Sequence, residues 1–198
     1  MKQPIFLLSA IVVLASCDNL SQKIVEGIEV DNLIQVRDTG LIAADGCGWT
    51  VFTDGTYFTV QEWDSNLQVD GLYIAASLTK TGETLQCGLD PNSSLEEVTL
   101  EMNSSDYTIL YYQKTQCADP WVGTDLAAIP EVEEMIAYLA ERDIDLLLAQ
   151  DVPMAIDGGV CLACDCPAQS FFRVGVTNAD VPALLDLGFI EEQPTLGE

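Results

Sequence analysis

Apolar and polar residues alternate over short stretches through the first half of the chain. The stretches richest in β-branched and aromatic residues, which favour strands, are residues 33–36, 49–52, 57–60, 72–75 and 97–102. Asp54-Gly55 lies between the second and third stretch and is typical of a tight hairpin turn. Asp70-Gly71 and Thr81-Gly82 predict further turns. Because no helical period appears here, the pattern predicts a small β-barrel or sandwich, preferably an OB-like barrel.

The second half of the chain mixes helical and strand patterns. Val132, Met135, Ile136 and Leu139 recur at helical spacing behind a proline and three glutamates, so residues 130–142 are predicted to form a helix. Strands are predicted at residues 107–112, 144–149 and 171–176, and a short helix at residues 180–187, which Gly188 ends. This order of elements is that of a small α+β layer and matches part of a ferredoxin-like unit.

These two patterns predict a fold of mixed class, β followed by α+β. We expect a β-rich, OB-like domain at residues 27–105 and a cysteine-containing α+β domain at residues 106–198. The alternative is that both halves share one core.

The first sixteen residues have the pattern of a signal peptide. A short basic start containing Lys2 precedes eleven apolar residues, 4–14, and two small residues then precede Cys17. Eleven residues are too few for a hydrocarbon core of about 30 Å, which takes roughly 20 helical residues. Their length and flanks are instead typical of the apolar part of a leader. We therefore expect residues 1–16 to be removed; the alternative is a buried N-terminal element.

Leu14-Ala15-Ser16-Cys17 resembles the lipobox of bacterial lipoproteins. The resemblance implies cleavage before Cys17, acylation of Cys17 and attachment to the inner or outer membrane of a bacterial cell envelope, on its periplasmic or surface face. Residues 17–26 would then be a tether. Each buried methylene contributes about 0.8 kcal/mol, so several acyl chains hold a protein far better than one. The expected contact with the membrane is through this lipid.

The charge of the chain excludes several partners and chemistries. Seven basic and 32 acidic residues give a net charge of -25, which disfavours nucleic acids and anionic lipid surfaces as direct partners. The absence of histidine excludes the usual Ser-His-Asp and Cys-His mechanisms and every histidine-containing zinc site. No cofactor is expected. The sequence favours a non-enzymatic binding or scaffolding module for a small ligand or an envelope protein.

The remaining cysteines are the strongest candidates for chemistry. They are Cys47, Cys87, Cys117, Cys161, Cys164 and Cys166. An even number in an exported chain indicates disulfide bonds, although six cysteines permit 15 pairings. Pairing Cys47 with Cys87 needs no crossing between the two halves, and Cys117 would then bond to one of the clustered cysteines while the other two pair locally.

Two alternatives use the same cluster. Cys117, Cys161, Cys164 and Cys166 have the chemistry of a four-thiolate cage for zinc or an iron-sulfur centre. Cys161-Leu-Ala-Cys164 is a C-x-x-C pair of the kind that thiol-redox proteins use, but no helix is predicted directly after it. An oxidising envelope compartment favours disulfides over both alternatives.

Overall fold

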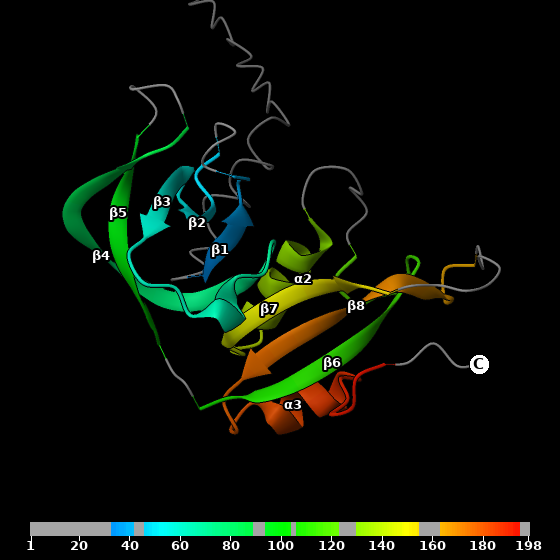
Figure 1. The fold of residues 1–198 in the computed structure, drawn as a ribbon. Coiled ribbons are helices and arrows are strands. Elements are labelled where there is room, and N and C mark those ends of the chain that lie inside the picture. Colours follow the sequence, from blue (N-terminus) through cyan, green and yellow to red (C-terminus); the bar gives the residue numbers. More distant parts are fainter. Residues whose placement is uncertain are drawn as a thin grey trace, which may run out of the picture.

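The structure is a computed structural model that describes residues 33–41, 46–88, 94–103, 106–122, 130–154 and 163–194 (Figure 1). The leader, the lipobox and the tether lie outside these ranges, so the expectations about them remain predictions. The elements are β1 (Leu33–Asp38), β2 (Trp49–Thr53), β3 (Thr56–Val60), the 3-10 turn η2 (Ser65–Leu67), β4 (Tyr73–Gln86), β5 (Ser94–Met102), β6 (Thr108–Thr115), α2 (Glu131–Ala140), β7 (Leu146–Pro153), β8 (Pro167–Val176) and α3 (Val181–Asp186). Neither α2 nor α3 has the length and apolar character that crossing a membrane requires.

The first five strands close into a barrel. Their order is β1-β2-β3-β5-β4, and β1 also pairs with β4, which completes the closure. All neighbours are antiparallel except β3 and β5, which run parallel at Thr59↔Glu97 and Val60↔Val98. Apolar side chains fill the interior, among them Ile34, Val51 and Ile74. The prediction of a small, mostly β fold with a barrel is therefore confirmed.

Two turn predictions in this half had different outcomes. Asp54 and Gly55 connect β2 to β3 with positive φ angles of 50° and 73°, which the tight turn of a hairpin requires. Thr81-Gly82 is not a turn, because both residues lie inside the 14-residue strand β4. The register with β5 shifts between Lys80 and Thr84 there, and Gly82 has a φ of 84°. Gly82 therefore marks an irregularity in a continuous strand, and such irregularities favour a glycine with positive φ just as turns do.

The remaining three strands form a layer that α2 and α3 cover. β8 lies between β6 and β7 and is antiparallel to both. The four residues of α2 that the sequence predicts to face the core are its four buried residues: Val132, Met135, Ile136 and Leu139. They pack in one cluster with Phe172 and Val174 of β8 and with Leu184 of α3. Both helices therefore cover the same face of this layer.

The two halves share one continuous sheet. β4 pairs with β7 at Tyr73↔Ala149 and Ile74↔Leu148, so the full strand order is β1-β2-β3-β5-β4-β7-β8-β6. Two separate apolar clusters lie along this sheet, one inside the barrel and one beneath the helices. The chain thus has two packed cores joined through β4. Figure 1 shows β4 running from its place beside β5 to its place beside β7.

Candidate functional site

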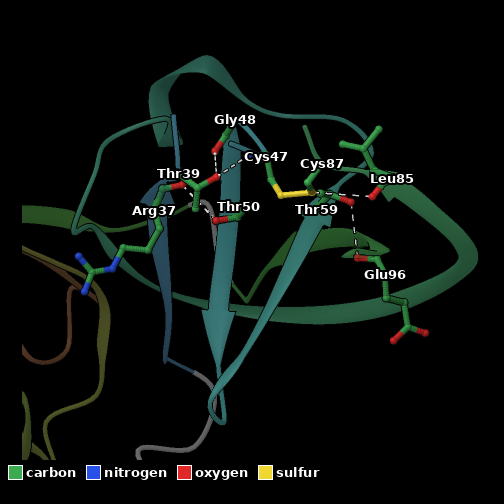
Figure 2. The surroundings of a disulfide bond; sticks show 9 residues. All are labelled: Arg37, Thr39, Cys47, Gly48, Thr50, Thr59, Leu85, Cys87 and Glu96. Carbon is green, nitrogen blue, oxygen red and sulfur yellow. Dashed lines mark hydrogen bonds between the residues drawn. A yellow bond between two sulfur atoms is a disulfide. The ribbon is translucent and has the colours of Figure 1, made fainter. Parts of the chain in front are cut away.

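A disulfide bond ties together two connections at one end of the barrel. Cys47 precedes β2 in the connection from β1, and Cys87 is the first residue after β4; the two are bonded across 40 residues of sequence (Figure 2). The amide of Cys47 donates to Oγ1 of Thr39 at 3.0 Å, and that hydroxyl donates to the carbonyl of Gly48 at 2.8 Å. Because Cys87 is only 2% exposed, the bond is anchored in packed structure.

The side of the adjacent hairpin that faces away from the barrel core carries hydroxyl and aromatic side chains. Val51 and Val60 point into the barrel core, so strand alternation places their neighbours on the outside. We call the set Thr50, Phe52, Tyr57 and Thr59 the hairpin face; its residues pair as Thr50↔Thr59 and Phe52↔Tyr57.

The two pairs of the hairpin face differ in accessibility. Thr50 and Thr59 are buried and donate to the carbonyls of Arg37 and Glu96. The rings of Phe52 and Tyr57 lie 4.6 Å apart between centroids, and Tyr57 is 41% exposed. The aromatic pair is therefore the accessible part of the hairpin face, and it lies next to the buried, hydrogen-bonded pair Thr50 and Thr59.

A chain of hydrogen bonds runs from the barrel to α2. Nε of Arg37 donates to Oε1 of Gln35 at 2.8 Å, and Nε2 of Gln35 donates to the hydroxyl of Tyr73 at 2.6 Å. That hydroxyl donates to Oε1 of Glu133 at 2.6 Å. Burial, together with the hydrogen bond to Glu133, raises the pKa of Tyr73 far above its ordinary value. Tyr73 therefore stays neutral and fixes α2 against the barrel.

A buried lysine lies on the helix-covered side of the other three strands. Nζ of Lys114 is 2.7 Å from Oε2 of Glu131 and 2.8 Å from Oδ2 of Asp151, and 4.7 Å from the centroid of the Phe172 ring. Burial alone would lower the pKa of Lys114, but its hydrogen bonds to the two carboxylates outweigh burial and raise the pKa. The pKa of Glu131 is also raised, in this case by burial of its carboxylate. The three groups form one ion cluster.

Asp119 forms a second polar cluster nearby. Its carboxylate accepts from the amide and hydroxyl of Thr115, at 2.9–3.1 Å, and from the hydroxyl of Tyr112 at 3.2 Å. Burial, reinforced by the charge of Asp119, raises the pKa of Tyr112 to about 12. Tyr112 also packs against Trp121, whose buried Nε1 has no hydrogen-bond partner among the described residues. Sequence reasoning missed both clusters; the available signal was Lys114, a rare basic residue two positions after the predicted strand at residues 107–112.

The predicted cysteine cluster contains disulfide bonds. Cys117 is bonded to Cys164, and Cys166 is also disulfide-bonded. Cys161 lies outside the described residues, and so does the proposed local pair that includes it. The prediction of disulfide bonds is confirmed, including the pair Cys47–Cys87. A four-thiolate cage would require these bonds to be reduced, and the described residues contain no group of three or more cysteine and acidic side chains placed to hold a metal.

A shallow pocket of about 250 Å³ lies on the face of the three-stranded layer that the helices leave open. Tyr111, Val152 and Phe171 provide its apolar wall, and Gln150, Arg173 and Gln193 its polar groups. The rings of Tyr111 and Phe171 meet edge to face at 5.8 Å. Nη1 of Arg173 is 3.5 Å from Oε1 of Gln150. The backbone of Tyr111 pairs with Ile190, which brings the segment containing Gln193 beside the pocket.

Comparison with protein-family models, with curated proteins and with solved structures finds no match to this chain.

Proposed function

We propose that this protein is a non-enzymatic binding module held at a bacterial envelope membrane by lipid on Cys17, and that its barrel is OB-like. The barrel has five strands in a Greek-key order, with β4 returning beside β1 and β5 inserted between β3 and β4. OB-like barrels bind ligands on the face of strands 2 and 3, between the connections 1–2 and 4–5. The observation that carries the proposal is the Cys47–Cys87 bond, which joins those two connections.

The charge of the chain narrows the ligand class. OB-like barrels bind oligonucleotides or oligosaccharides, and a net charge of -25 opposes the former. The aromatic pair of partly buried Phe52 and exposed Tyr57 offers an apolar platform for a sugar ring. We therefore assign the hairpin face to a neutral oligosaccharide.

The C-terminal half is proposed to support the barrel as a partial ferredoxin-like unit. β6, α2 and β7 form a β-α-β crossover with β8 inserted between the two strands, as in the split arrangement of that fold. Under this proposal the domains are residues 27–105 and 106–198, joined by the pairing of β4 with β7.

The binding proposal is tested by calorimetric titration of the full mature chain with neutral oligosaccharides. Tyr57→Ala should weaken binding about tenfold, or about 1.4 kcal/mol, the effect of removing a central aromatic contact. Leu185→Ala is the matched control, because Leu185 is also 41% exposed but lies on α3. Equal effects of the two variants, or no binding by the parent protein, would contradict the proposal.

The anchoring proposal needs a separate experiment. Expression of the full chain in a bacterium with a clickable fatty acid should label the protein, and Cys17→Ser should abolish the label and release the protein from membranes. Recovery of the unmodified chain from the cytoplasm, with residues 1–16 attached, would contradict export and lipidation together.

A further inference from the structure

Arg173 differs from most other basic residues in this acidic chain. Of the five basic residues in the described ranges, Lys80, Lys114 and Arg142 each lie within 4.0 Å of a carboxylate. Arg173 contacts the amide oxygen of Gln150 at 3.5 Å and no carboxylate of the described residues. A guanidinium has five N–H donors in a planar fork. Most of the hydrogen-bonding capacity of Arg173 is therefore unused within the described structure.

The strand positions around Arg173 on this face contain no acidic residue; the nearby acidic residues Glu191 and Glu192 precede Gln193 in the C-terminal segment. Phe172 and Val174 of β8 belong to the core under the helices, so strand alternation directs Phe171 and Arg173 to the open face. The register extends this face to Tyr111 and Gln113 of β6 and to Gln150 and Val152 of β7. Acidic residues make up 32 of the 198 positions, yet this set contains none. Asp151, which lies between Gln150 and Val152 in β7, faces the other side and bonds to Lys114.

We propose that the pocket formed by Tyr111, Gln150, Val152, Phe171, Arg173 and Gln193 binds a small apolar monocarboxylate. The fork of Arg173 matches a carboxylate, with which guanidinium groups form two parallel hydrogen bonds. The amides of Gln150 and Gln193 supply additional donors at the rim. Tyr111 and Val152, which are partly exposed, contact the apolar body of the ligand, and Phe171, only 2% exposed, adds little surface.

The volume of the pocket sets the size of the ligand. About 250 Å³ is below the roughly 300–1,000 Å³ of typical pockets for drug-sized molecules. A ligand with one ring or a short acyl chain fits this space. The site is on β6, β7 and β8, whereas the hairpin face is on β2 and β3, so the two sites are separate.

Titration of the full mature chain with 3-phenylpropanoate, followed by amide NMR, tests the proposal. The neutral amide of the same acid is the paired ligand. At about 0.15 M salt, charges more than about 8 Å away are largely screened, so the overall negative charge does not mask the local interaction. We expect the acid to shift the side-chain signals of Gln150 and Gln193 and to bind at least tenfold more tightly than its amide, since hydrogen bonds between charged groups are about twice as strong as neutral ones.

Variants of Arg173 connect this preference to the guanidinium. Arg173→Gln should lose at least tenfold in affinity for the acid and leave affinity for the amide unchanged, and Arg173→Lys should recover only part of the loss because it lacks the fork. Arg142→Gln is the matched control, since Arg142 caps the end of α2 through the carbonyl of Tyr138. NMR spectra of each variant report whether it is folded.

The source of the carboxylate is distinguished in a second arm. A tetrapeptide ending in phenylalanine with a free carboxyl group is compared with its C-terminal amide. Tighter binding of the free peptide than of 3-phenylpropanoate would assign the pocket to peptide chain ends and overturn the small-acid assignment. Equal affinity of the acid and its amide, or an unchanged affinity in Arg173→Gln, would overturn the carboxylate site altogether. The oligosaccharide titration is independent of both results.

Discussion

Replacing Lys114 with methionine should destabilise the fold by about 3 kcal/mol, the lower end of the range for breaking a buried ion pair. The Lys114 side chain is 6% exposed and holds two carboxylates, those of Glu131 and Asp151. Methionine has a side chain of similar length but loses the ammonium group over the Phe172 ring and leaves both carboxylates without a counter-ion. The destabilisation therefore comes mainly from unpaired charge.

The lower end of the range follows from the exposure of the two partners. Glu131 and Asp151 are 32% and 37% exposed, so water solvates part of each carboxylate after the lysine is removed. Removing the charges as well should restore most of the stability, because replacing a complete buried ion cluster with neutral groups costs little. The triple variant Lys114→Met, Glu131→Gln, Asp151→Asn is thus expected to be more stable than Lys114→Met alone.

Urea unfolding at neutral pH measures both effects, with Lys80→Met as the control. Nζ of Lys80 is 2.6 Å from Oε2 of Glu96, as short as the bonds of Lys114, but the Lys80 side chain is 64% exposed. Exposed pairs contribute about 0–1 kcal/mol. If Lys80→Met and Lys114→Met lose the same stability, or if the triple variant is the least stable, burial does not decide the strength of these pairs and the reasoning fails.

Three further predictions concern the whole fold. Burial, and to a smaller extent the carboxylate of Asp119, raises the pKa of Tyr112 from 10 to about 12. The Tyr112 hydroxyl therefore loses its proton at a lower pH in the unfolded chain than in the folded protein. Stability should fall between about pH 10 and pH 12, and Tyr112→Phe should reduce the fall in urea midpoints measured across that range. The double variant Cys47→Ser, Cys87→Ser should lose about 4 kcal/mol on the chain-entropy estimate for a 40-residue loop, measured by urea unfolding against the oxidised parent. Single-tryptophan variants that retain Trp63 in the barrel or Trp121 beneath the helices should show coincident unfolding transitions, and separate midpoints would disprove coupling of the two cores.

Local sequence patterns were sufficient to predict helix α2 and the hairpin of β2 and β3. The period of Val132, Met135, Ile136 and Leu139 depends only on residues within one helix, and Asp54-Gly55 specifies a turn within four residues. The Thr81-Gly82 prediction was wrong because a positive φ at glycine suits a turn and a strand irregularity equally well. Pairing with β5, more than ten residues away in sequence, decides between them.

The polar sites at Lys114 and Arg173 could not be predicted, because they are formed by contacts between residues far apart in the sequence. Arg173 lies between Phe172 and Val174, and Lys114 lies between Gln113 and Thr115. The sequence does not state which face of either strand the helices will cover. Once α2 covers one face, Lys114 is buried against Glu131, whereas Arg173 points to the open face. The different environments of these two cations follow from the side on which the helices pack.

β4 makes the two cores depend on each other. Tyr73 and Ile74 are consecutive residues, and strand alternation sends the first into the core beneath the helices and the second into the barrel. The same two residues pair with β1 on one side and with β7 on the other. The hydroxyl of Tyr73 adds bonds to Gln35 and Glu133, which lie on opposite sides of the junction. Separating the halves would expose apolar surface on both sides of one strand and break a buried hydrogen-bond chain, so the structure favours a coupled pair of cores over two independently folding units.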